Sequence, residues 1–553
     1  MPAPDRLTRI RLAGLAASTV MAAGAYGAGA LPSGDADAVL WPDTAPPGSA
    51  GYWLGLAGWL VGLAALAGAW WRLGVRIGEG TVAGTGAVPL GRVLRTGLLW
   101  AVPLLLAPPT GSRDVYAYAC QGALWLDGVN PYTVGVLPGG CVWSAAVPTL
   151  WQDTSAPYGP LAIALSGGVV ALARLATDST DSQLLVAVAL LRAVALVGVA
   201  LVAGCLPRLA RAGGVDPVRA TWLGLLSPLI MIHAVSGAHN DALMLGLILV
   251  ALTLAAAPSR GGVVPVAVAG AVLGLAIATK VTAIVALPFA VLLGAAGSRR
   301  RQVRRPGQRE VRRPGQRQVR RPGRPEVRRP GLPRLVLLTG GALGGGALTF
   351  GVLTLATGLD LGWIGALSDT GRLVQWTSLP TGLGMAAGYV LRLAGRPEAV
   401  DLAVTVARLL GLAVLAATVV VLLVRGWWTM PVPDRLARRR LVLAAGLAFA
   451  ALAVLSPIFY PWYALAAVTV LAAGLPGGPW TYRVAGILVL VSFLVLPDGL
   501  GLAVSTKLPG ALFDVVLVGV LTVLAYRRWR TAGGVPATDG GGERRPADRS
   551  EPR

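Results

Sequence analysis

Charged residues are scarce in this sequence. They account for 13% of its 553 residues, against roughly 25% in soluble globular domains, while hydrophobic residues account for 55%. Runs such as "LLVAVALLRAVALVGVALVAGCL", from Leu184, reach the ~20 apolar residues that a bilayer helix needs. They lack the alternating polarity of the strands of a membrane barrel. The composition therefore excludes an ordinary soluble domain and predicts an all-α polytopic membrane protein.

Lysine, histidine and cysteine are also rare. The only lysines are Lys280 and Lys507, and the chain has two histidines and three cysteines. No P-loop, metal-ligand spacing or nucleophile elbow occurs, so ATP-driven work and covalent serine catalysis have no support. Cys120 and Cys141 flank a segment that we expect to face an oxidising exterior, where they could pair. Whether the geometry permits a disulfide is not readable from the sequence.

Positive charge is concentrated in one segment. Between Arg299 and Arg334 there are 15 arginines and two glutamates, a net +13 of the chain's total of +23, in an eight-residue repeat such as "EVRRPGQR". Pro-Gly in each copy disfavours helix and strand, and no aromatic side chain is interleaved for base stacking. We therefore expect a disordered cytoplasmic linker near anionic head groups, with no nucleic-acid partner. Deleting residues 302–330 should spare activity.

The basic residues also predict orientation, because cytoplasmic loops are enriched in Arg and Lys. We expect a multi-pass protein of the plasma membrane, with both termini in the cytoplasm and every polar motif on the outer side. Segments 157–177 and 381–395 are interpreted as juxtamembrane or re-entrant helices on the outer face. About fourteen spans are expected, at roughly residues 9–31, 52–71, 93–108, 183–206, 220–235, 240–257, 263–279, 281–297, 335–357, 400–424, 441–457, 461–475, 484–497 and 511–526.

These spans predict two membrane modules. Residues 1–297 form the first, with a large outer loop at 109–182, and residues 334–527 form the second. The Arg/Pro/Gly-rich linker at 298–333 joins them. Residues 528–553 are expected to be a disordered cytoplasmic tail.

Two polar motifs have both a functional and an ordinary structural explanation. Asp114 is either a carboxylate that meets an amphiphilic substrate or an ion-paired helix end beside Arg113. In "HND", Asn240 or Asp241 could simply cap a helix, but His239 has no such role, and a helix N-terminus also binds anions. His233, inside a span, is expected to be a packed core residue.

Two further segments are open in the same way. Lys280 lies between two apolar runs, where a charge indicates a functional site and a phosphate is its natural partner; the alternative is an exposed lysine in a short outer turn. "LSPIFYPWYAL", from Leu455, brings together Tyr460, Trp462 and Tyr463. These rings form either a membrane aromatic belt or a surface that binds sugar or lipid.

Taken together, "RDVYAYACQGALWLDGVNPYTVG", "PYGPL", "GAHNDALM", "TKVTAIVALPF" and "SPIFYPWYAL" resemble, in order and spacing, the polyprenol-phosphomannose-dependent α-1,6-mannosyltransferases of actinobacteria. The resemblance covers about residues 10–527, with the Arg-rich repeat as an insertion. It implies the GT-C fold and the synthesis of the mannan core of lipomannan and lipoarabinomannan. The implied partners are a polyprenyl-phosphomannose donor on the outer face, a lipid-anchored mannan acceptor and membrane lipids.

The family also implies an acid in the first large outer loop as catalytic base, which here is Asp114. The wider class often shows an Asp-X-Asp pattern, but the position two residues on is Tyr116, so no cofactor is implied and a divalent metal is unsupported. General-base help of this kind contributes about 10²–10⁴-fold to a rate, and direct displacement would invert a β-linked donor. The other candidates are Arg113, Lys280 and Arg372 for the donor phosphate, and Tyr116, Tyr118, Asn130, Tyr132, Tyr158, His239, Asn240, Asp241, Tyr460, Trp462 and Tyr463 for the substrates.

Three rival functions remain. A GT-C enzyme could transfer another lipid-linked sugar, because no residue identifies the sugar directly. A flippase or secondary transporter would usually show internal repeats and broken helices around a midplane site; no half-to-half repeat is evident here, and the polar motifs gather at one interface. A structural partner in a wall-synthesis complex would leave the Asp114 segment without a function.

Overall fold

The protein is helical throughout the part that its computed structural model describes, namely residues 5–30, 48–83, 87–257, 262–297, 331–367, 371, 373–430 and 434–532. In these ranges the only β-type pairing is an isolated bridge between Val495 and Gly501. The Arg-rich repeat lies outside them. The helices are α1 (Arg6–Ala28), α2 (Ala50–Ala83), α3 (Leu90–Leu106), α4 (Asp114–Leu126), α5 (Thr149–Gln152), α6 (Pro160–Ala176), α7 (Thr180–Ala212), α8 (Pro217–Leu225), α9 (Pro228–Ile230), α10 (Asp241–Ala255), α11 (Val263–Thr279), α12 (Ala286–Gly297), α13 (Leu332–Thr357), α14 (Gly362–Ala366), α15 (Leu379–Leu393), α16 (Val400–Trp428), α17 (Asp434–Leu455), α18 (Ala464–Gly474), α19 (Pro479–Ser492), α20 (Leu502–Ser505) and α21 (Lys507–Ala532).

Helices occupy all fourteen segments expected to span the membrane, as their long apolar runs require. Five helices of the described chain are each long and apolar enough to cross a bilayer, namely α2, α7, α13, α16 and α21. A sixth candidate combines α8 and α9 with the turn that follows them. The protein is therefore an all-helical membrane protein, and fourteen crossings remain a prediction.

The sixth candidate is bent by 48° between α8 and α9. The break falls at Ser227, whose hydroxyl accepts a hydrogen bond from the backbone N–H of Ile230, and Pro228 follows at the first position of α9. Proline has no N–H to continue the preceding helix, so the chain restarts with a new cap. A π-helix at Met231–Ser236 extends α9 towards α10.

The polar segment after α3, expected to be part of an outer loop, is instead helical from its first acidic residue. In α4, Asp114 lies in the first turn, where a carboxylate is favoured by the helix dipole, and the side chains from Asp114 to Leu124 are buried. A Cβ on Gly122 would lie 2.4 Å from the backbone of Ser166, so α4 and α6 pack backbone to backbone. This close packing makes α4 a rigid support for the residues that it carries.

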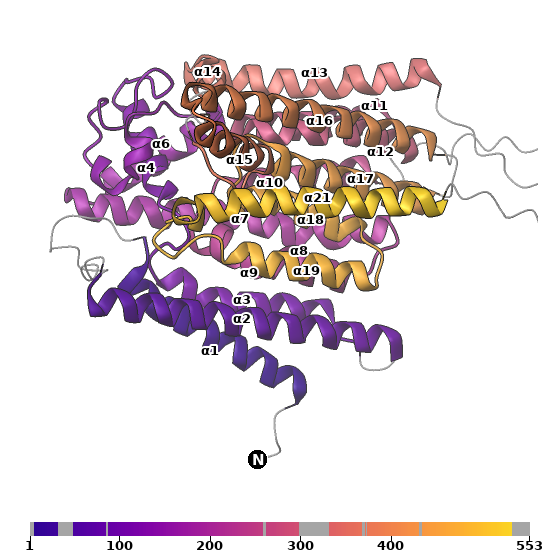
Figure 1. The fold of residues 1–553 in the computed structure, drawn as a ribbon, viewed down its shortest axis with the longest axis horizontal. Coiled ribbons are helices and arrows are strands. Elements are labelled where there is room, and N and C mark those ends of the chain that lie inside the picture. Colours follow the sequence, from indigo (N-terminus) through magenta and orange to yellow (C-terminus); the bar gives the residue numbers. More distant parts are fainter. Residues whose placement is uncertain are drawn as a thin grey trace, which may run out of the picture.

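The ends of many helices meet at one end of the molecule. Most of the long helices lie side by side, and α4, α6 and α14 gather at one end of the bundle (Figure 1). Loops at this end are tied together: the N–H of Ala30 donates to the carbonyl of Pro109, and that of Gly111 to the carbonyl of Pro497, both at 2.9 Å. The loops after α1, α3 and α19 therefore form one connected layer.

A buried arginine connects this layer to the π-helix. Arg192 of α7 is 6% exposed. Its guanidinium donates to the carbonyls of Leu105 and Ala107, at the end of α3, and to that of Ser236. These carbonyls lie at helix C-termini, where no backbone N–H of the same helix is available to them. Arg192 supplies the missing donors and so joins the end of α3 to the π-helix.

The opposite ends of the helices carry basic residues. Arg6 of α1 pairs with Glu79 of α2 at 3.2 Å, and Arg219 of α8 reaches the carbonyl of Leu475 after α18 at 3.5 Å. Residues 298–330, between α12 and α13, lie outside the described residues. The helix α21 continues to Ala532, past the boundary at 527 that we expected from the sequence.

Candidate functional site

Asp114 lies at the N-terminus of α4, on the wall of a small cavity. Asp114 is 8% exposed, and its backbone N–H donates to the hydroxyl of Ser112 at 3.0 Å. Burial raises the pKa of Asp114 from 3.8 to about 6; the Ser112 hydroxyl and the Lys280 ammonium oppose this rise, and the Asp241 carboxylate adds to it. A carboxylate with this pKa is ionised at neutral pH and is a better proton acceptor than an ordinary aspartate.

The cavity beside Asp114 has aromatic walls. Tyr460 and Trp462 stack with their ring centroids 4.4 Å apart and their planes 7° from parallel. Flat rings of this kind bind the C–H faces of sugars through apolar contact. The lining comprises Asp114, Ala117, Gln121, Trp151, Thr154, Pro157, Tyr158, Tyr460, Trp462 and Tyr463.

A second cavity, of about 460 Å³, adjoins the first and shares Pro157, Tyr158 and Tyr463 with it. Lys280 and Asp241 stand on its wall, and the remaining lining is mainly apolar, with Met244, Leu367, Leu412, Phe449, Leu452, Ala453, Ile458 and Ala466 among its members. Its charged groups are the Lys280 ammonium and the Asp241 carboxylate, and the rest of the lining suits the apolar part of an amphiphile. We refer to this space as the Lys280 cavity and to the first as the Asp114 cavity.

Lys280 and Asp241 form a buried ion pair. The ammonium, at the C-terminal end of α11, contacts both carboxylate oxygens of Asp241, at 3.0 and 2.8 Å. It also lies 4.4 Å from the ring centroid of Tyr463, a cation–π distance. The side chain of Asp241 is therefore engaged by Lys280, and that of Asn240 makes no capping hydrogen bond.

His239 lies next to Asp114. Its Nδ1 is 3.6 Å from Oδ2 of Asp114 and 3.5 Å from the hydroxyl of Tyr118. The imidazole stacks on Trp462 with centroids 4.2 Å apart, and His233 packs against it at 5.5 Å. The structure thus brings together the acid of α4, the "HND" segment and the "SPIFYPWYAL" segment, which are far apart in the sequence.

A disulfide anchors the outer loop. Cys120 of α4 is bonded to Cys141, which answers the question that the sequence left open. The guanidinium of Arg113 reaches the carbonyl of Ala146 in the same loop at 3.4 Å. Both contacts hold the loop that carries Trp151 and Thr154 over the Asp114 cavity.

Five of the tyrosine and asparagine candidates line neither cavity: Tyr116, Tyr118, Asn130, Tyr132 and Asn240. The hydroxyl of Tyr116 donates to the carbonyl of Ala30, and Asn130 accepts a hydrogen bond from the N–H of Tyr132 at 2.9 Å in a turn. Tyr132 is buried in a small apolar cluster with Trp363. Arg372 lies outside the described residues.

The sequence analysis missed Gln121, Trp151 and Thr154, which line the Asp114 cavity. Gln121 follows Asp114 by seven residues, which is two turns of a helix, and it therefore shares a face with Asp114. That spacing would have identified Gln121 if the segment had been recognised as helical. Trp151 and Thr154 belong to the outer loop, and no periodicity in the sequence indicates which of its side chains turn inward.

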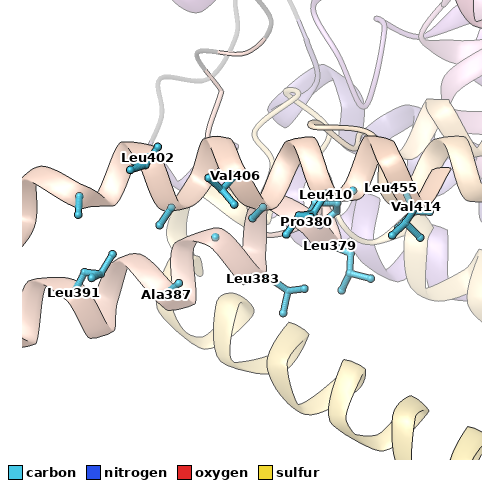
Figure 2. Close-up of a pocket in the computed structure, with 15 residues that line it drawn as sticks. Leu379, Pro380, Leu383, Ala387, Leu391, Leu402, Val406, Leu410, Val414 and Leu455 are labelled. Atoms are coloured by element: carbon cyan, nitrogen blue, oxygen red, sulfur yellow. The ribbon is translucent and has the colours of Figure 1, made fainter. Parts of the chain in front are cut away.

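An apolar groove of about 560 Å³ runs between α15 and α16 beside these cavities. Figure 2 shows side chains such as Leu383, Leu391 and Leu402 along it, with no nitrogen or oxygen atoms among the sticks. At its inner end a Cβ on Gly411 would lie 2.4 Å from Pro380, so the two helices are in close contact there. The groove carries no titratable group and belongs to the apolar surface of the protein.

Among the described residues, no three His, Cys, Asp or Glu side chains gather as they would around a metal ion. Comparison with known proteins gives two family matches: residues 11–296 match the N-terminal domain of alpha-(1->6)-mannopyranosyltransferase, and residues 380–526 match the MptB C-terminal domain. The chain belongs to the alpha-(1->6)-mannopyranosyltransferase family. It is therefore a glycosyltransferase, and the resemblance noted in the sequence is confirmed.

Individual relatives cover most of the chain. An alpha-(1->6)-mannopyranosyltransferase of Mycobacterium tuberculosis is 32% identical over 470 residues, which is 78% of this chain and 74% of the relative. Alpha-(1->6)-mannopyranosyltransferase B of Corynebacterium glutamicum is 27% identical over 531 residues, which is 91% of this chain and 79% of the relative. No solved structure matches the chain significantly.

Proposed function

We propose that this glycosyltransferase moves mannose from polyprenyl-phosphomannose to a growing, lipid-anchored α-1,6-mannan on the extracytoplasmic face, with inversion at the anomeric carbon. The carrying observation is the adjacency of two cavities, one with the Asp114 carboxylate and aromatic walls, the other with the Lys280 ammonium, its partner Asp241 and otherwise mainly apolar walls. These are the groups needed at the two sides of a sugar that passes from a lipid phosphate to a hydroxyl.

The donor is assigned to the Lys280 cavity. Its apolar side chains suit the first isoprene units, and the ammonium, which has three N–H donors, faces the phosphate while it remains held by Asp241. Charge that develops on the leaving phosphate is stabilised by a preorganised cation in a site from which water is largely excluded.

The reacting hydroxyl of the acceptor is assigned to the Asp114 cavity, whose volume of about 50 Å³ admits a hydroxyl group but not a whole sugar ring. The oxygen of this hydroxyl forms the new bond to the anomeric carbon while the bond from that carbon to the phosphate oxygen breaks. The polyprenyl phosphate leaves with the electron pair, and the hydroxyl proton passes to the Asp114 carboxylate. A single displacement of this kind converts a β-linked donor into an α-mannoside. The raised pKa of Asp114, about 6, favours its role as the base.

Two observations support an extracytoplasmic site. The Cys120–Cys141 disulfide joins α4 to the outer loop, and disulfides persist in oxidising compartments. Arg6 and Arg219 mark the end of the bundle opposite to the Asp114 cavity, as the positive-inside rule predicts for a site that faces outward.

The test is mannosyl transfer by membranes that contain matched amounts of wild type, Asp114→Asn or Asp127→Asn, given polyprenyl-phosphomannose and a short α-1,6-mannoside. Asp127 ends the same helix and forms an exposed ion pair with Arg174, so its substitution should have little effect. We expect Asp114→Asn to lose about 10²-fold or more. Equal transfer by wild type and Asp114→Asn would refute the base assignment. Absence of transfer by wild type would refute the donor or the sugar, and other lipid-linked sugars would then be tried.

A further inference from the structure

The backbone that leads to His239 is irregular. The chain forms a π-helix at Met231–Ser236, and Ala238 has φ = 54°, the only positive φ of a non-glycine residue in the described ranges. A left-handed backbone is unfavourable for an L-residue, because its Cβ comes too close to the following carbonyl oxygen. Both π-turns and backbone strain are concentrated at functional sites. The segment therefore carries a conformational cost that ordinary helix packing would have avoided.

The result of this geometry is the placement of one imidazole. The N–H of His239 donates to the carbonyl of His233 at 3.1 Å, and its ring is held against Trp462. The side chain is 0% exposed and lines neither cavity. Its polar neighbours are the Asp114 carboxylate and the Tyr118 hydroxyl, which both face Nδ1. The ring is therefore placed to act on the carboxylate and not on a substrate.

The charge state of His239 follows from its surroundings. Burial lowers its pKa well below the usual value, and the neighbouring His233 and Lys280 lower it further. The ring is therefore neutral at pH 7 and carries a proton on one nitrogen only. Nε2 has no hydrogen-bond partner. Nδ1 faces the Asp114 carboxylate, which in its ionised form can only accept a hydrogen bond. A proton on Nδ1 is the tautomer that satisfies the carboxylate.

We propose that His239 is a positioning residue: its Nδ1–H points at Oδ2 of Asp114 and holds the carboxylate so that the other oxygen faces the acceptor hydroxyl. This inference rests on the proposed function, in which Asp114 is the base. The present 3.6 Å between Nδ1 and Oδ2 is longer than a hydrogen bond. Such contacts tighten in the complex with substrate.

Other groups also act on the Asp114 carboxylate, and a test must leave them unchanged. They come from the loop before α4, from α4 itself, from the turn before α6, from α10, from the end of α11 and from the segment before α18. They are Ser112, Tyr118, Tyr158, Asp241, Lys280, Tyr460 and Tyr463. A substitution at His239 leaves all of these residues in place, and among them the Tyr118 hydroxyl, which also faces Nδ1, loses a contact.

The experiment compares the pH dependence of kcat/KM for mannosyl transfer in three full-length variants. His239→Phe keeps a ring on Trp462 and removes the donor. His239→Asn keeps an N–H near the position of Nδ1. His233→Phe changes the neighbouring buried histidine, which Trp462 also contacts, and is the matched control.

Loss of a donor to the ionised form raises the pKa of a carboxylate. We expect the acid limb of the pH profile, where Asp114 becomes protonated, to lie about one unit higher in His239→Phe than in wild type. At the pH of the wild-type midpoint, transfer would then be about fivefold lower from ionisation alone. His239→Asn should return the limb towards the wild-type position, and His233→Phe should not move it. A purely structural role would lower kcat/KM at all pH values without moving the limb.

Two outcomes separate this inference from the proposed function. If Asp114→Asn retains transfer, the base assignment fails, whatever the histidine variants do. If Asp114→Asn is inactive but His239→Phe has the wild-type acid limb, the positioning role of His239 is overturned and the base assignment stands. Should His239→Phe fail to insert, His239→Leu, which also lacks an N–H donor, decides: a limb displaced to higher pH supports the positioning role, and a limb equal to that of wild type overturns it.

Discussion

Removal of one charge of the Lys280–Asp241 pair should destabilise the protein, whereas removal of both should not. The two side chains are 11% and 3% exposed, and they are joined at 2.8 Å. Loss of one partner leaves a buried charge uncompensated, which costs about 3–5 kcal/mol. Lys280→Gln and Asp241→Asn should each show this loss, and the double variant, in which two neutral amides replace the ions, should recover most of it.

The size of the effect can be worked out from the length of the chain. Unfolding entropy of about 2.1 cal/mol/K per residue, the value for globular proteins, gives at most about 1.2 kcal/mol/K for 553 residues, because the linker and the tail are expected to be disordered already. A loss of 3–5 kcal/mol therefore lowers Tm by at least about 3 °C, measured by thermal unfolding in detergent. Arg174→Gln is the control, because it breaks an exposed pair with Asp127, which is worth about 0–1 kcal/mol.

The same variants test the phosphate role of Lys280. The double variant should keep its Tm yet lose about 10²-fold in transfer, because the cation that faces the donor phosphate is gone. Wild-type transfer by a stable double variant would refute the assignment of Lys280 to the donor. Equal stability of both single variants and wild type would show that the pair is not effectively buried.

Three further predictions concern α4. Wild-type kcat/KM should fall about tenfold between pH 7 and pH 5, because the Asp114 base has a pKa of about 6 and loses its function as it is protonated; a constant rate over this range would contradict this. Replacement of Cys120 and Cys141 by serine should cost about 2–4 kcal/mol, visible as a lower Tm and as weaker transfer when the outer loop loosens, and an unchanged Tm would argue against a contribution of the bond. Gly122→Ala should reduce transfer at least tenfold by pushing α4 from α6, whereas Gly168→Ala, which has open space at its Cβ, should match wild type; equal activity of the two would contradict the packing argument.

The class of protein could be predicted from composition alone. Long apolar runs form helices in a membrane, because every backbone N–H and C=O must find a partner within the segment. Helices occupy each expected span. The family could also be recognised from the order of its polar segments, as the relatives confirm. The positions of the helices and the order of the family motifs are local properties and are therefore readable along the chain, whereas α2 and α7 extend well beyond the spans expected at 52–71 and 183–206.

Asp114 and Lys280 could also be singled out from the sequence, because an ionisable residue beside an apolar run is unusual enough to indicate function. Their partners could not. Asp241 had a capping role and a substrate role as alternative explanations, and only the structure shows that it binds an ammonium 39 residues away in the sequence. Such a pairing depends on which helix ends meet, and no local pattern encodes it.

The tertiary structure alone decided the arrangement around the base. Packing of α4 on α6 made a helix of a segment expected to be a loop, and this placed Gln121 on the same wall as Asp114. His239 reaches Asp114 only because the π-helix at Met231–Ser236 and the left-handed backbone of Ala238 turn the chain before α10. The sequence by itself determined which residues can do chemistry in a membrane, through their rarity among apolar neighbours. Which of them touch one another was decided by close packing, which depends on contacts between residues distant in the chain.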